Sequence, residues 1–208
     1  MGMSADIVFP PQVREEQERR GSRPAYEARE RKRPFPNSVT PDLAAFLATI
    51  DTAFLGTVGA DVRPYIQHRG GPQGFIKVID DKTLAFADFA GNRQYITLAN
   101  LGTNDKAYLF LIDFAARRRV KIWGRARVIE DDPGLLAALS DPAYRARPER
   151  AIAFTIEAWD VNCPSHITPR FTEGEVLDAT AIMRQRIAAL EAEVAGLKEQ
   201  LGRTAAPA

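Results

Sequence analysis

A short polar stretch, Gly91–Gln94, contains residue types that could bind an anion. It lies between an apolar run that ends at Asp88 and a segment with helical periodicity from Arg93 to Leu101. A helix start offers free N–H groups, glycine permits close backbone approach, and arginine can bind phosphate through two hydrogen bonds. The stretch therefore predicts a phosphate-binding turn. The residues alone also allow a plainer interpretation, in which Asn92 caps a helix and Arg93 is solvated.

Two further groups of polar residues are placed at the ends of predicted strands. A basic triplet opens one long strand, and because side chains alternate along a strand, Arg119 and Lys121 share a face that Trp123 continues. His68 and Arg69 follow an earlier strand, where a donor or cation could stabilise negative charge. The plainer alternatives are a solvated loop end for the triplet and a hydrogen-bonded turn for His68.

The segment from Glu157 to Phe171 contains Cys163 and His166 in a Cys-x-x-His spacing. A metal ion would need a third or fourth ligand, and His68 is the other histidine of the chain, so we expect no metal site. We expect Cys163 to pack rather than to act as a nucleophile, because no His–carboxylate pair lies near it in the sequence.

Composition and charge exclude several classes of protein. The 208 residues include 45% hydrophobic and 26% charged residues, as in an ordinary globular protein with one sizeable core. A net charge of +1 gives no field that would attract nucleic acid or a membrane surface. The single cysteine fits a reducing compartment, and no apolar run approaches the ~18 residues of a membrane span. We expect a soluble, cytoplasmic protein.

The elements that must position these residues are mostly short strands. A helix capped by Thr40 is followed by apolar runs joined by turns at 59–61 and 80–82. Few helices separate these runs, which predicts an antiparallel sheet of about six strands, closed into a barrel to remove its edges. We therefore predict a mainly β domain over residues 39–171.

Two helical segments flank this domain. Residues 1–38 form a charged helical arm that we expect to wrap around the core or a second subunit; the alternative is that it stays partly disordered. Residues 172–208 contain a helix with apolar residues spaced 4-3-4-3-4 from Met183 to Leu201, the pattern of a short coiled coil. The alternative for this helix is that it packs on its own barrel.

Three stretches of the sequence together resemble the pyridoxamine 5′-phosphate oxidase-like family. They are FLGTVGADVRPYIQHRGG, GFIKVIDDKTLAFADFAGNRQYITLANL and KAYLFLIDFAARRRVKIWGRARVIEDD, and the likeness covers about Thr40 to Arg170. The resemblance implies a six-stranded split β-barrel that binds flavin mononucleotide (FMN). It also implies an obligate homodimer with two FMN molecules in grooves between the subunits.

The resemblance also assigns roles to individual residues. In the family, the phosphate segment has a small polar residue before two basic ones; Asn92 and Arg93 match this pattern, whereas Gln94 departs from it and removes one positive charge. Arg119 matches a polar residue that reaches the phosphate or the flavin from the partner subunit, and Gln67 stands near the place of a basic residue. The expected cofactor-binding residues are Gln67, His68, Arg69, Ala87, Asp88, Gly91, Asn92, Arg93, Gln94, Arg118, Arg119, Lys121, Trp123, Asn162, His166 and Arg170.

The function that follows is an FMN-dependent oxidoreductase that moves electrons between a donor, such as a reduced nicotinamide, and a small molecule. One alternative is a flavin-binding sensor or carrier without turnover. Another is a split barrel that holds the deazaflavin F420 or haem, for which His68 or His166 would be the axial ligand. Oxidation of pyridoxamine phosphate itself is disfavoured, because the basic cluster for the substrate phosphate is missing near the C-terminus.

Overall fold

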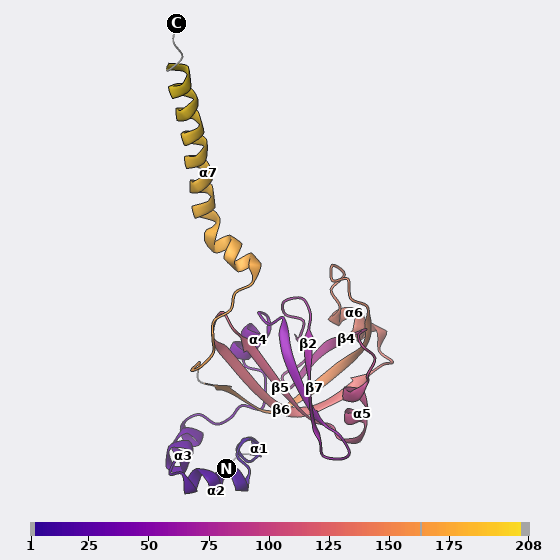
Figure 1. Cartoon of the computed structure of the whole chain (residues 1–208). Helices are drawn as coiled ribbons and strands as arrows, with labels where there is room; N and C mark the ends of the chain where they lie inside the picture. The colour runs from indigo at the N-terminus through magenta and orange to yellow at the C-terminus, as the bar shows by residue number, and fades with distance from the viewer. Residues whose placement is uncertain (1–2, 163, 205–208) are drawn as a thin grey trace. The chain divides into compact units, whose positions relative to one another are not determined.

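The apolar runs of the sequence form one antiparallel sheet in the computed structural model, which describes residues 3–162 and 164–204 (Figure 1). The strand order is β2-β1-β5-β6-β7-β4-β3. The strands are β1 (Thr52–Val58), β2 (Pro64–Gly70), β3 (Lys77–Val78), β4 (Thr83–Phe89), β5 (Lys106–Asp113), β6 (Arg118–Ile129) and β7 (Pro148–Asn162). The mainly β class is confirmed. The described residues contain seven strands rather than six, because two residues between Ile76 and Ile79 also pair as β3.

The sheet curls around a single main core. Apolar side chains alternate along the strands, so that Ala53 and Leu55 of β1 point inward and are fully buried. Residues of β1, β4, β5, β6 and β7 contribute to the same core, together with helix α4 (Pro41–Leu47). Thr40 caps α4 as predicted, its side-chain oxygen accepting a hydrogen bond from the Leu43 N–H at 3.3 Å.

The N-terminal arm consists of α1 (Met3–Val8), α2 (Pro11–Arg19) and α3 (Arg23–Lys32). Its apolar residues form a small second cluster with Ala158 and Trp123 on the outer face of the sheet. An ion pair between Arg29 and Asp160 of β7 adds a polar contact. The arm therefore packs on its own sheet and covers part of that outer face.

Two short helices lie beside the sheet, α5 (Ile96–Thr103) and α6 (Pro133–Leu139). The predicted start of α5 at Arg93 is wrong, since the helix begins three residues later. The hairpin between β1 and β2 turns at Val62, which has a left-handed φ of 61° where glycine would be easier.

The chain divides into two compact units, with the boundary between Ile167 and Thr168. The second unit consists mainly of α7 (Glu173–Thr204), a single helix of 32 residues. Among the described residues, no helix combines the length and apolar character that crossing a membrane requires. Cys163 lies outside the described residues, so its packing stays a prediction.

Candidate functional site

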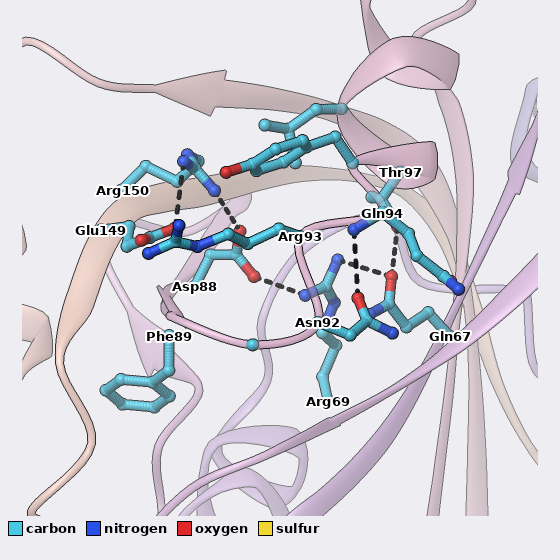
Figure 2. Close-up of a pocket in the computed structure, with 13 residues that line it drawn as sticks. Gln67, Arg69, Asp88, Phe89, Asn92, Arg93, Gln94, Thr97, Glu149 and Arg150 are labelled. Carbon is cyan, nitrogen blue, oxygen red and sulfur yellow. Dashed lines mark hydrogen bonds and ion pairs between the residues drawn. The ribbon is translucent and has the colours of Figure 1, made fainter.

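Polar residues from both ends of the sheet meet in one pocket of about 170 Å³ (Figure 2). β2 is the first strand in the sheet order and β4 is the last but one, so the curl of the sheet brings them together. The start of β7 and the loop before α5 complete the walls. The lining residues are Gln67, Arg69, Asp88, Phe89, Gly91, Asn92, Arg93, Gln94, Tyr95, Thr97, Leu98, Glu149 and Arg150.

Asp88 is the central charge of this pocket. It is 5% exposed and forms ion pairs with Arg69 of β2 and, at 3.1 Å, with Arg150 of β7. Asp88 and Arg150 are direct partners in the β4–β7 register. Arg150 also pairs with Glu130 at 3.1 Å and with Glu149 at 3.2 Å. The Arg69–Asp88 pair thus joins two strands that share no ladder hydrogen bonds.

The surroundings shift the pKa values of Arg69 and Arg150 in opposite directions. Burial lowers the pKa of Arg69, and the nearby Asp88 carboxylate opposes this only in part. Burial also disfavours the charge of Arg150, but the hydrogen bond and charge of Asp88, with the contributions of Glu130 and Glu149, raise its pKa. Within the described part of the chain, the Nε atom of Arg69 is buried without a hydrogen-bond partner. A ligand acceptor could satisfy it.

Gln67 forms the wall of the pocket beside Arg69. Its side-chain oxygen accepts a hydrogen bond from the Thr97 hydroxyl at 2.9 Å, and longer ones of 3.4 Å from Arg69 and from the Tyr65 hydroxyl. These contacts fix the amide against the first turn of α5. Gln67 therefore presents its amide group in a defined orientation.

The loop before α5 has an unusual backbone. Arg93 (φ 57°) and Tyr95 (φ 54°) both adopt the left-handed conformation, which non-glycine residues rarely take. Asn92 accepts a hydrogen bond from the Gln94 N–H at 3.2 Å and thereby holds the turn. The alternative that Asn92 caps the helix is wrong, because Tyr95 occupies the N-cap position. Two left-handed residues separated by a single residue are the kind of backbone strain that often marks a ligand-binding segment.

Arg93 lies at the open side of the pocket, as its exposure shows. Figure 2 shows its side chain directed toward the part of β7 that carries Glu149 and Arg150. No ion pair engages the Arg93 guanidinium within the residues that the structure describes. The lining contains three arginines and two carboxylates, Asp88 and Glu149, and Glu130 pairs with Arg150 from outside the lining. Arg93 is therefore the lining arginine that is left without an ion pair among the described residues.

A second cavity of about 160 Å³ lies next to the first. Gln67, Arg69, Asp88 and Phe89 line both cavities, and His68, Gly70 and Ala87 line only the second. His68 lies on the outer face of β2, where its ring meets the edge of Phe54 with centroids 5.8 Å apart. The predicted residues His68 and Ala87 therefore line a cavity that also contains the Arg69–Asp88 ion pair, but they do not line the first pocket.

The basic residues of β6 lie away from both cavities within one copy of the chain. Lys121 and Trp123 share the outer face of β6, with the Lys121 ammonium 5.2 Å from the Trp123 ring centroid and 3.8 Å from Asp160. Burial lowers the pKa of Lys121, and Asp160 opposes this. Arg118 stacks instead on the Phe46 ring at 4.7 Å. Neither Arg118, Arg119, Lys121 nor Trp123 lines the two cavities, and their role at a cofactor stays a prediction.

The remaining predicted residues follow β7. Asn162 pairs with Arg119 at the end of the β6–β7 ladder, and His166 is exposed with a left-handed φ of 64°. Arg170 belongs to the second unit, so its relation to the pocket stays a prediction.

Sequence reasoning missed Glu149, Arg150, Tyr95 and Thr97. Arg150 directly precedes the apolar run of β7 in the sequence, but only the pairing of β7 with β4, distant in sequence, brings it to Asp88. The left-handed Tyr95 has no signal in its residue type. Thr97 could have been found as a polar residue in the first turn of the predicted helix.

Comparisons with known proteins agree with this fold. The family model described as Pyridoxamine 5′-phosphate oxidase matches residues 39–163. Among solved structures, the chain is similar to HupZ of Group A Streptococcus, with 18% identity, a TM-score of 0.49 and coverage of 64% of this chain and 99% of that one. It is also similar to an FMN-binding protein from Syntrophomonas wolfei (17% identity, TM-score 0.45, 73% and 95% covered). A third similar structure is HutZ, the haem storage protein from Vibrio cholerae (16% identity, TM-score 0.41, with 58% of this chain and 92% of that chain covered). No curated protein matches the sequence.

Proposed function

This chain belongs to the pyridoxamine 5′-phosphate oxidase family, and we propose that it is an FMN-binding flavoprotein whose pocket at Asp88 holds the phosphate end of the cofactor. The observation that carries the proposal is the convergence of Arg69, Arg93 and Arg150 on one pocket, in which Arg93 takes part in no ion pair with the described residues. A phosphate dianion is stabilised by such arginines, which bind it through charged hydrogen bonds.

The individual groups fit a phosphate ester. The Arg93 guanidinium is exposed and unengaged within the described residues, and Arg69 has a buried Nε atom without a partner. The space beside Gly91 is open, since an added Cβ atom would meet its nearest neighbour, the Phe89 carbonyl oxygen, only at 3.9 Å. A ligand can therefore approach the backbone of the turn closely.

The size of the pocket supports a second subunit at the site. The two cavities measure about 170 and 160 Å³, whereas pockets for small ligands typically measure roughly 300–1,000 Å³. We propose that a second copy of the chain completes the site, as the homodimer of a twofold assembly. Arg119 and Lys121, on the outer face of the sheet, are the residues that we assign to the partner's share of the site.

Bound FMN would supply the redox chemistry, and the chain's own residues would bind and orient it. Arg69, Arg93 and Arg150 bind the phosphate, Asp88 holds Arg69 and Arg150 in place, and Gln67 directs its amide toward the cofactor. On this basis we propose an oxidoreductase that acts on a small molecule, with a reduced nicotinamide as one class of electron donor. A flavin-binding sensor or carrier would use the same binding residues without turnover.

Haem is the second candidate cofactor, because His68 lines the second cavity and could serve as an axial ligand. The absorption spectrum of the purified protein distinguishes the candidates, since flavin and haem have different visible bands. We expect a flavin spectrum. A haem spectrum that His68→Ala abolishes would favour the second candidate.

A titration with FMN and riboflavin tests the phosphate site itself. Because charged hydrogen bonds contribute about 1.5–3 kcal/mol each, FMN should bind at least about ten-fold more tightly than riboflavin. Quenching of flavin fluorescence measures both affinities. Equal affinities would reject the assignment of this pocket to the phosphate.

A further inference from the structure

We infer that α7 pairs with α7 of a second copy of this chain as a parallel, in-register, two-stranded coiled coil. The helix carries an apolar seam that stays open to solvent next to the described residues: its members are 41–69% exposed. The seam consists of Met183, Ile187, Leu190, Val194, Leu197 and Leu201. Alternating spacings of four and three residues keep these side chains on one stripe of a helix that winds around a partner.

The residue types along the seam favour two parallel strands. In heptad notation Ile187 and Val194 occupy a positions, and Leu190 and Leu197 occupy d positions. β-branched residues at a with leucine at d pack best in a parallel dimer. A seam that merely covered another surface would not need this alternation.

The charges that flank the seam complement each other across a parallel pair. The g position Arg186 would face Glu191 of the second copy, and Glu193 would face Lys198 of the second copy. Both pairs have opposite signs. In an antiparallel pair centred on the seam, Glu191 would face Glu191 and Glu193 would face Glu193, which is repulsive.

A groove on α7 has the form of a knob-into-hole site. Ile187, Leu190, Glu191 and Val194 line it, joined by Ala195 and Lys198. The first four residues are an a, d, e and following a position, the set of four that receives a d-position knob. In the parallel pair this knob is Leu190 of the second copy.

The seam is short, because it spans fewer than three heptads and Gly196 lowers helix stability by about 1 kcal/mol relative to alanine. A coiled coil of this length is a weak dimer on its own. A dimer of the sheet units, as proposed above, would hold the two helices at a high effective concentration and so favour their pairing. The affinity of the α7 pair therefore depends on the proposed dimer of the sheet units, whereas its parallel, in-register geometry does not.

Disulfide cross-linking of the full chain tests the pairing. Cys163→Ser removes the native thiol, and Leu197→Cys then places one thiol at a d position of the seam, toward its C-terminal end. Ala192→Cys, at the outer f position of the same helix, is the matched control. Under mild oxidation the Leu197→Cys chain should form covalent dimers about ten-fold faster than the control, because the two thiols come within disulfide reach.

The same experiment identifies the wrong geometries. In the centred antiparallel pair the two residues 197 would lie about 15 Å apart along the axis, so no selective cross-link would form. Equal rates for the two variants, or no covalent dimer at all, would overturn the inference; the latter is the result expected if α7 packs on its own sheet unit. Neither position lines the FMN pocket, so retained FMN binding would show that the coiled coil alone has failed.

A charge exchange tests the register. Adding Glu191→Arg to the Leu197→Cys chain places two positive charges at the first g–e pair and should slow cross-linking several-fold. Adding Arg186→Glu as well restores opposite charges and should restore the rate. Failure of this rescue would contradict the parallel, in-register arrangement.

Discussion

At the residue scale, the buried Asp88 balances the charges of two partly buried arginines, Arg69 and Arg150. Asp88→Asn would leave Arg69 without an acidic partner in a site that already disfavours its charge. Breaking a buried ion pair from one side typically costs about 3–5 kcal/mol of unfolding free energy. Urea unfolding measures this loss. Asp105→Asn is the control, because it removes an exposed partner of Arg125 and should cost less than about 1 kcal/mol. Equal effects would show that Asp88 is not a structural charge.

Arg93, in contrast to Asp88, is exposed, and its guanidinium forms no ion pair with the described residues. Arg93→Ala should weaken FMN binding about ten- to a hundred-fold, the loss of one charged hydrogen bond of 1.5–3 kcal/mol. The melting temperature should stay the same, because alanine and arginine bear a similar cost at φ 57°. Fluorescence titration measures the affinity, with the exposed Arg127→Ala as control. An unchanged FMN affinity would mean that Arg93 is merely solvated.

Tyr108 predicts a pH dependence of stability on the outer face of the sheet. Burial, with a smaller contribution from Asp160, raises the pKa of Tyr108 from its ordinary value of 10.0 to about 12. A raised folded pKa gives stability that is complete below pH 10 and is lost as the pH rises toward 12. After an allowance for solvent screening, the loss is about 1–2 kcal/mol.

Tyr108→Phe should remove this part of the alkaline loss. Denaturant unfolding at several pH values above 9 would show a shallower decline for the variant than for the natural chain, while tyrosine absorbance reports the titration directly. Parallel declines would reject the shifted pKa of Tyr108.

At the scale of elements, the bulge in β7 lies opposite Gly124 of β6 and depends on it. The register of β6 with β7 shifts between Trp123 and Gly124. A Cβ atom at this position would lie 2.1 Å from the Thr155 carbonyl oxygen and 2.5 Å from the Phe154 ring. Gly124→Ala should therefore destabilise the sheet by about 3 kcal/mol or more.

Gly102 provides the control for that substitution. It lies in α5, and an added Cβ atom would meet nothing within 4 Å, so Gly102→Ala should be neutral or slightly stabilising. Thermal unfolding of both variants is the measurement. A mild effect at Gly124 would mean that the bulge can open at little cost.

Local patterns in the sequence were sufficient for most elements but not for the pocket. The alternation of Ala53, Leu55 and their neighbours predicts β1, and Thr40 followed by proline predicts α4, because both signals are local. The pattern predicts that α5 begins at Arg93, but the helix begins at Ile96, because Arg93 and Tyr95 are left-handed and cannot continue a right-handed helix. Their conformation is imposed by the surrounding structure and has no counterpart in residue type.

The candidate site shows the same division. The turn at 91–94 and Arg69 were identified because glycine and basic residues at strand ends are a local signal. Arg150 was missed, since it reaches Asp88 only through the long-range pairing of β4 with β7. Sequence spacing does not reveal which strands become neighbours in a curled sheet.

At the scale of the whole molecule, the final prediction concerns assembly. The outer face of the sheet carries Ile66, Phe54 and Phe110 beside Lys121, and a homodimer would bury such a surface on each copy. A stable interface of standard size covers about 800 Å² per partner, which should outweigh a coiled coil of fewer than three heptads.

Deletion of all residues after Gly174 should therefore leave a dimer that still binds FMN. Light scattering measures the mass, and on dilution the truncated chain should dissociate at a higher concentration than the full chain, because it lacks the contribution of α7. A monomer that has lost FMN would instead assign the dimer to α7, since groups from two copies would no longer meet at the pocket.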